Sequence, residues 1–199
     1  MDSSKCYISG KPYEANTPEF WEAVGKRNWR EQNTRDRPFE FRAIADRIAD
    51  DRPVLEIGCA YGYLSDHLPE GVEYIGVDVS PYMVEIARGL WPGRTFLAAD
   101  IWELAPSLEN AVGTVVAQQW VEHYASPQAA LELCLRLAQH CLIVNVPKEE
   151  PEGQNPAHLW TDITEEEFLE VLEGVSPPDG EVELFRGNSG HLNGRIIWR

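Results

Sequence analysis

The sequence lacks the features that mark membrane-spanning and secreted proteins. No apolar run approaches the roughly 20 residues needed to cross a bilayer, so we expect no membrane partner. The N-terminal stretch does not combine a basic start with an apolar segment, and we therefore expect no secretory signal. The cysteines, Cys6, Cys59, Cys134 and Cys141, form no C-x-x-C pair. This usage is typical of a protein in a reducing, cytoplasmic setting.

The sequence also has few basic residues. Lysine and arginine together number 17 against 33 aspartates and glutamates, which gives a formal net charge of -16. Such a charge repels phosphate backbones, because their binding depends on lysine and arginine displacing counterions. Nucleic acid is therefore not an expected partner. With 199 residues, 43% of them hydrophobic and 25% charged, the chain is typical of one soluble globular domain that buries a core without disulfides.

From Pro53 onward, apolar strand-like runs alternate with helical patterns, an order that predicts an α/β fold with a parallel sheet wrapped by helices. The runs are almost continuously hydrophobic, as expected for strands covered on both faces. Two further candidates near the C-terminus are joined by a short turn-rich loop, which predicts an antiparallel ending. In order, the candidates are PVLEIG, VEYIGVD, RTFLAAD, AVGTVVAQ, HCLIVNVP, EVELFRG and GRIIWR.

Capping residues mark where helices begin between these strands. Ser80 and Ser126 each precede a proline, and Thr164 stands three residues before Glu167 in a capping box. The segment YLSDHL after Gly62 also has a helical pattern. The first fifty residues contain two amphipathic patterns, TPEFWEAVGKRNWR and RPFEFRAIADRIAD. We therefore expect residues 1–50 to form a helical cap or lid on a core of residues 51–199.

A glycine turn follows the first predicted strand. Gly58, the small Ala60 and Gly62 leave the backbone open to close approach by a ligand. Asp78 ends the next strand, where a carboxylate can accept the hydroxyls of a ribose. This spacing predicts a ligand that contains a nucleoside. The dinucleotide fingerprint G-x-G-x-x-G would require glycines where the chain has Ala60 and Tyr63, which disfavours NAD.

Four segments, VLEIGCAYGYLS, YIGVDVSPYMVEIAR, FLAADIWEL and VVAQQWVEHY, resemble the class I S-adenosylmethionine-dependent methyltransferases. The resemblance covers roughly residues 51 to 199. It implies a doubly wound, Rossmann-like, seven-stranded and mostly parallel sheet with an antiparallel terminal strand. It also implies S-adenosyl-L-methionine as cofactor and S-adenosyl-L-homocysteine as product. Ala60 departs from the commonest glycine pattern, and its methyl group adds little bulk while restricting the backbone.

The resemblance implies which residues hold the cofactor. By likeness, Glu56 organises the glycine turn near the methionine moiety, Asp78 binds the ribose and Asp100 accepts the exocyclic amine of the adenine. The full set expected to contact the cofactor is Glu56, Gly58, Cys59, Ala60, Gly62, Asp78, Val79, Met83, Asp100, Ile101 and Gln118.

The expected reaction is a displacement at a sulfonium methyl, for which the enzyme holds the nucleophile in line and excludes water. His123, at the open edge of the sheet, is the leading candidate for a general base. The alternative is a histidine hydrogen-bonded into a helix start. His158 is a second catalytic candidate, and Trp160 is a candidate contact of the acceptor. Some relatives bind a divalent metal through E-x-x-E-H, but Gln119 replaces the first acid here, so no metal is expected.

The expected function is methyl transfer to an oxygen or nitrogen of a small-molecule acceptor. Tyr13, Trp29 or Arg30 is a candidate partner of the cofactor carboxylate, with a packing helix as the alternative for this segment. Two other functions are retained as alternatives: a protein that binds the cofactor as a sensor or partner subunit without transferring methyl, and a nicotinamide-dependent oxidoreductase. The sequence leaves the oligomeric state open.

Overall fold

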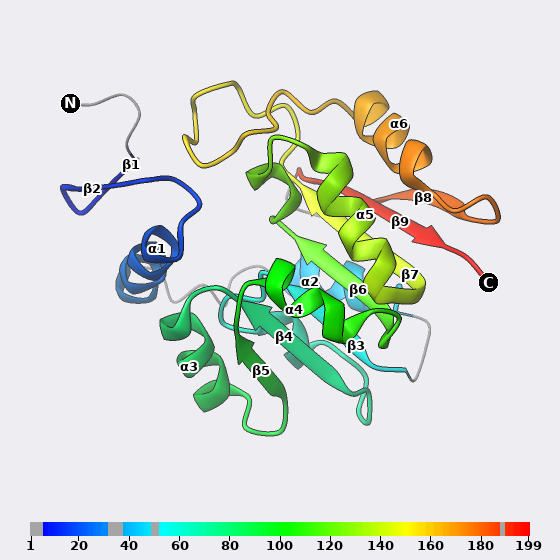
Figure 1. Cartoon of the computed structure of the whole chain (residues 1–199), viewed down its shortest axis with the longest axis horizontal. Helices are drawn as coiled ribbons and strands as arrows, with labels where there is room; N and C mark the ends of the chain where they lie inside the picture. Colours follow the sequence, from blue (N-terminus) through cyan, green and yellow to red (C-terminus); the bar gives the residue numbers. More distant parts are fainter. Residues whose placement is uncertain (1–5, 32–37, 49–51, 188–189) are drawn as a thin grey trace.

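A central seven-stranded sheet organises the chain (Figure 1). The computed structural model describes residues 6–31, 38–48, 52–187 and 190–199. The strand order is β5-β4-β3-β6-β7-β9-β8. Six strands run in the same direction, whereas β9 is antiparallel to both of its neighbours, β7 and the edge strand β8. This confirms the predicted doubly wound α/β fold with a reversed strand near its end.

Each predicted strand segment forms one strand of the sheet. Because β3, β4 and β6 are parallel neighbours, their carboxyl ends meet at one edge, where ligands of doubly wound folds collect. The bounds are β3 Val54–Ile57, β4 Tyr74–Asp78, β5 Thr95–Ala98, β6 Val112–Gln118, β7 Ala138–Val146, β8 Glu181–Arg186 and β9 Leu192–Ile197.

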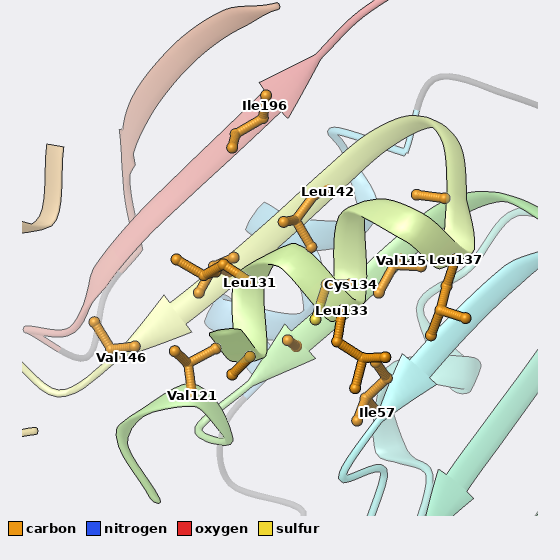
Figure 2. Close-up of a cluster of buried hydrophobic side chains, with 14 of the residues drawn as sticks. Ile57, Val115, Val121, Leu131, Leu133, Cys134, Leu137, Leu142, Val146 and Ile196 are labelled. Carbon is orange, nitrogen blue, oxygen red and sulfur yellow. The ribbon is translucent and has the colours of Figure 1, made fainter. Parts of the chain in front are cut away.

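Helices cover both faces of the sheet. The larger apolar cluster joins one face to α4 Ile101–Leu108, α5 Pro127–Leu137 and α6 Glu165–Val175. Figure 2 shows Leu131, Cys134 and Leu137 of α5 beside Val115 and Leu142 of the strands. A second cluster joins the opposite face to α2 Pro38–Ala45 and α3 Pro81–Leu90. None of the helices in the described part of the chain has the length and apolar character needed to cross a bilayer.

The predicted capping residues begin the helices. The Ser80 and Ser126 side chains accept from backbone N–H groups three residues later, at 3.3 and 3.4 Å. The Thr164 hydroxyl accepts from the Glu167 N–H at 3.1 Å, which confirms one half of the predicted capping box. The Glu167 carboxylate accepts instead from the Trp160 indole N–H at 2.9 Å. It thereby ties α6 to the loop that precedes it.

The N-terminal region contains both predicted helices, α1 Pro18–Glu31 and α2. It also contains a hairpin that the sequence did not predict, β1 Cys6–Ile8 paired with β2 Lys11–Tyr13. The two helices differ in position: Ile44 of α2 is fully buried against the sheet, whereas Phe20 of α1 belongs to a separate small cluster. The division of the chain into a cap and a core at residue 50 stays a prediction.

The helix expected over YLSDHL is only a short 3₁₀ turn, η1 Tyr63–Asp66. Pro69 gives a reason, since a proline disfavours the α conformation in the residue before it, here Leu68. Gly62 enters the turn with a left-handed φ of 71°. A Cβ at Gly62 would lie 2.4 Å from the ring of Phe96, so this glycine is required by packing as well as by its backbone conformation.

We expect Gly62→Ala to destabilise the fold more than Gly71→Ala. Both glycines have a left-handed φ, but a Cβ at Gly71 would meet no atom within 4 Å. Strain alone costs about 1–2 kcal/mol, and overpacking adds about 1–3 kcal/mol. The expected losses are therefore about 2–5 kcal/mol for Gly62→Ala and about 1–2 kcal/mol for Gly71→Ala, measured by urea unfolding. Equal losses would show that Phe96 moves aside without cost.

Candidate functional site

A cavity of about 410 Å³ lies where β3, β4 and β6 end. Its floor is formed by the glycine turn at 58–61 and by the ends of these strands, and α1 contributes Trp21, Val24 and Asn28 to its wall. Figure 1 shows α1 on the side to which the strand arrows point. This is the crevice in which doubly wound folds bind ligands.

Asp78 holds the glycine turn against the start of α3. Its Oδ2 accepts from the Ala60 N–H at 2.9 Å, and its Oδ1 accepts from the Ser80 N–H at 2.8 Å. Ala60 has a left-handed φ of 45°, a conformation that costs an alanine about 1–2 kcal/mol. A carboxylate offers about four lone-pair sites, so Asp78 keeps capacity to accept two ligand hydroxyls.

Burial shifts the pKa values of the two acids beneath the turn, Asp78 and Glu56. Burial raises the pKa of Asp78, while the N–H groups of Ser80 and Ala60 act in the opposite direction. Burial raises the pKa of Glu56 to about 8, although the Tyr74 hydroxyl donates a hydrogen bond to this carboxyl. The Glu56 carboxyl is therefore mainly uncharged near neutral pH, and its bond to Tyr74 links β3 to β4.

Most residues expected to contact the cofactor do line the cavity. Asp100 also caps α4 by accepting from the Trp102 N–H at 2.9 Å. The Gln118 Oε1 is buried and has no hydrogen-bond partner among the described residues. Gly62 is the exception, since it lies outside the lining and packs against Phe96. The lining members of the expected set are Glu56, Gly58, Cys59, Ala60, Asp78, Val79, Met83, Asp100, Ile101 and Gln118. Their contact with a cofactor stays a prediction.

His123 lies at the other end of the cavity, in the short turn η2 Val121–His123. Its Nδ1 is 3.0 Å from the carbonyl oxygen of Ala157, which can only accept. This contact assigns the ring hydrogen to Nδ1 and leaves a lone pair on Nε2 of the neutral ring. The pKa of His123 is lowered to about 4, mainly by burial and to a smaller degree by His158, while the carbonyls of Ala157 and Gln119 act in the opposite direction. His123 is therefore neutral near pH 7.

His158, the second catalytic candidate, does not line the cavity. Its Nδ1 contacts the Glu150 carboxylate, and its Nε2 is 2.9 Å from the Asn155 amide nitrogen. The rings of His158 and His123 meet edge to face with centroids 4.9 Å apart. Since both ring nitrogens of His158 have partners, its contacts fit a residue that positions His123. A catalytic role for His158 stays a prediction, as does acceptor contact by the buried Trp160.

Sequence reasoning missed the burial of Glu122. Its side chain is 0% exposed, and neither carboxyl oxygen has a hydrogen-bond partner among the described residues. Burial raises its pKa to about 8. One ligand atom each from Glu122, His123 and His158 lie within 4.8 Å of one another, a spacing at which these groups could hold a metal ion. The sequence showed the adjacent acid and histidine but not the approach of residue 158. The expected absence of a metal stays a prediction.

Sequence reasoning predicted a contribution of the N-terminal segment but missed which of its residues line the cavity. Asn16, Trp21 and Asn28 line the cavity, and the Trp21 ring lies 4.6 Å from that of His123. The candidates Tyr13 and Trp29 do not line it; Trp29 packs on Tyr61 instead. The third candidate, Arg30, has a side chain outside the described residues. The amphipathic pattern revealed the helix, but spacing alone could not show which of its residues face the cavity.

Comparisons with known proteins bear on the fold and on the likeness to methyltransferases. Residues 55–140 match the family model for a methyltransferase domain. Over 132 residues the chain is 25% identical to a ubiquinone biosynthesis O-methyltransferase of Alkalilimnicola ehrlichii. This match covers 62% of the chain and 51% of that protein, so the chain spans about half the length of the curated relative it matches.

Solved structures share the fold over most of the chain. A SAM dependent methyltransferase from Aquifex aeolicus superposes with a TM-score of 0.66 at 17% identity, covering 92% of this chain and 99% of that one. Magnesium protoporphyrin IX methyltransferase from Synechocystis PCC 6803, solved with bound SAM, gives a TM-score of 0.58 at 18% identity, covering 96% and 88%. The predicted resemblance to the class I fold is confirmed.

We expect Glu122→Gln to stabilise the protein increasingly as pH rises. In the folded state the Glu122 pKa is about 8, against an ordinary value of 4.5. Unfolding therefore releases a proton between these values, and the stability contributed by the protonated carboxyl is lost as pH rises from about 4.5 to about 8. Glutamine has no proton to lose. At 1.36 kcal/mol per pKa unit, the gain approaches an upper limit on the order of 5 kcal/mol above pH 8.

The check is urea unfolding of both proteins at pH 5 and pH 8. Glu166→Gln, at an exposed position on α6, serves as a control. Its difference in unfolding free energy from wild type should not grow comparably between pH 5 and pH 8. The unfolding free energies of Glu122→Gln and wild type could also differ by the same amount at both pH values. That result would mean that water or another group solvates the Glu122 carboxylate.

Proposed function

We propose that the protein transfers a methyl group from S-adenosylmethionine to an oxygen or nitrogen of a small-molecule acceptor. The match of residues 55–140 to a methyltransferase domain and the class I fold support this proposal. The observation that carries the proposal is the placement of Asp78. Its carboxylate accepts from the glycine turn and still has lone pairs to offer to a ligand in the cavity. This is the arrangement expected for a carboxylate that binds the hydroxyls of a ribose.

The cavity lining has groups that fit each part of this cofactor. Asp78 would hold the ribose, Val79 and Met83 would flank the adenine, and Asp100 would accept its amine. The bare backbone at Gly58 would lie under the methionine moiety, and the unpartnered Gln118 Oε1 could accept from its ammonium group. When bound, S-adenosylmethionine supplies an electrophilic methyl group on a sulfonium.

His123 is the residue best placed to take a proton from the acceptor. Its Nε2 lone pair is available in the neutral ring, because Nδ1 donates to Ala157. A pKa of about 4 makes it a weak base in the ground state. It is strong enough, however, for a proton that leaves as the methyl group arrives, since the attacked oxygen or nitrogen then becomes far more acidic.

The lining also restricts the acceptor. Among the described residues around the cavity there is no lysine or arginine, and the wall carries many aromatic rings. A carboxylate or phosphate would enter this setting without a cationic partner, which is costly. We therefore expect a neutral, flat or apolar acceptor. The aromatic members of the lining are Trp21, Phe41, Tyr61, Tyr63, Trp120 and Tyr124.

Residues 1–50 would act as a cap through α1, which covers the cavity. Glu22 of α1 accepts from the Ser80 hydroxyl at 3.0 Å and from the Tyr82 N–H at 3.1 Å. The Tyr61 hydroxyl donates to the Gly25 carbonyl at 2.7 Å. These bonds fasten α1 to the residues on both sides of the cofactor site, so exchange of the cofactor would require them to open.

Replacement of Asp78 should weaken cofactor binding. We expect Asp78→Ala to lose about 1.5–3 kcal/mol of binding free energy for S-adenosylhomocysteine, the range for hydrogen bonds to charged groups, or roughly 10- to 150-fold in Kd. Titration calorimetry measures this, with Asp66→Ala on η1, outside the cavity lining, as control. Unchanged affinity would place the ribose elsewhere, and binding of NAD in place of S-adenosylhomocysteine would overturn the proposed function.

Replacement of His123 should slow methyl transfer without loosening the cofactor. Loss of a general base costs about 10²- to 10⁴-fold in rate. We expect His123→Ala to show this loss on an acceptor found by screening phenols and amines for production of S-adenosylhomocysteine, with partial rescue by added imidazole. His140→Ala, at a position outside the cavity lining, is the control. A wild-type rate in His123→Ala would remove the base from the mechanism, and cofactor binding without activity on any acceptor would favour a sensor.

A further inference from the structure

The residues that orient His123 come from outside the segment that matches the methyltransferase domain. That segment covers residues 55–140, whereas Asn16 precedes α1 and Ala157 lies in the loop after β7. Asn16 has a left-handed φ of 61°, a conformation that asparagine tolerates better than most residues. This backbone conformation places the Asn16 side chain next to His123.

Asn16, Ala157 and His123 form one hydrogen-bonded group. The Asn16 Nδ2 donates to the His123 carbonyl at 3.1 Å and to the Ala157 carbonyl at 2.9 Å. The same Ala157 carbonyl accepts from the His123 Nδ1. A carbonyl oxygen has two lone pairs, so the Ala157 carbonyl is fully used. The amide orientation of Asn16 is fixed as well, because a flipped Oδ1 would face two carbonyl oxygens.

We propose that Asn16 is a positioning residue for methyl transfer, which holds the His123 ring as its Nδ1–H tautomer with the lone pair on Nε2. Asn16 acts through two groups: it fixes the carbonyl that receives the ring hydrogen, and it fixes the backbone from which the ring projects. This inference rests on the proposed function, since the tautomer matters only if Nε2 accepts a proton.

The helix over the cavity, α1, and the proposed base, His123, are therefore joined through Asn16. Phe20 of α1 packs in the same small cluster as Ala157, together with Cys6 and Ile8 of β1. When α1 lies over the cavity, Asn16 reaches His123. If α1 moves away to exchange the cofactor, Asn16 would leave with it, and its bonds to the His123 and Ala157 carbonyls would break.

Asn16→Gly tests the role of the side chain without adding backbone strain, because glycine accepts a left-handed φ freely. Asn110→Gly is the matched control: Asn110 also has a left-handed φ, of 51°, but it is exposed and lies outside the cavity lining. Asn16→Asp is a second variant of nearly the same size. It replaces the donor amide with a carboxylate that cannot donate to the two carbonyls.

The readout is the ¹⁵N chemical shift of both His123 ring nitrogens near pH 7, in the free protein and with S-adenosylhomocysteine. Wild type and Asn110→Gly should show a single Nδ1–H tautomer. Asn16→Gly and Asn16→Asp should show a mixture of tautomers, while their affinity for S-adenosylhomocysteine stays within about twofold of wild type. On an acceptor found by the screen above, Asn16→Gly should lower kcat by roughly tenfold or more. It should add no further loss in a His123→Ala background, as expected for residues that act as a unit.

A pure Nδ1–H tautomer in both Asn16 variants would overturn the inference, and so would an equal loss of rate from Asn16→Gly with and without His123. Neither result would affect the proposed function, which fails separately if S-adenosylhomocysteine does not bind. If Asn16→Gly does not fold, the tautomer in Asn16→Asp decides.

Discussion

The contact of Asp78 with two backbone N–H groups is the interaction on which the site depends. One carboxylate oxygen accepts from Ala60 in the glycine turn, and the other accepts from Ser80 at the start of α3. The Ser80 hydroxyl in turn donates to Glu22 of α1. A single buried acid thus connects the end of β4 to the turn after β3 and, through one serine, to the helix above the cavity. The strained φ of Ala60 is held by this contact rather than by local preference.

The cavity has two ends that are built differently. The end at which the cofactor is expected to bind is made from strand ends of the sheet, whose positions follow from the parallel register. The end at His123 is made from chain segments far apart in sequence, and side-chain bonds from Asn16 hold them together. The spacing of residues in the sequence therefore indicates the first end, whereas the second end depends on contacts between distant segments, which spacing does not show.

The strands, their order along the chain and the capping residues were predictable, because each leaves a local pattern. Continuous apolar runs gave the buried strands, and the spacing of Gly58 and Asp78 gave the turn and its acid. The hairpin of β1 and β2 and the burial of Glu122 were not predictable, since both depend on tertiary packing. The prediction of a helix after Gly62 was wrong, because Pro69 limits the helical segment to one short turn. Gly62 belongs to the predicted glycine turn, and the structure adds a packing reason for a glycine there, since a Cβ would meet the Phe96 ring. Its contact with a cofactor stays a prediction.

Three titratable groups at the site, Glu56, Glu122 and His123, favour their uncharged forms although the chain is strongly acidic. Burial favours the uncharged forms of Glu56, Glu122 and His123 near pH 7, and it does so whatever the surface charge, because desolvation acts locally. A sulfonium bound beside Glu56 would favour ionisation of that carboxyl, and conversion of the sulfonium to a neutral thioether would remove this effect. Methyl transfer would therefore change the electrostatics of the cavity floor, so cofactor and product are expected to bind with different pH dependence. The acceptor proton, taken up by His123, would need a route to solvent, which opening of α1 would provide.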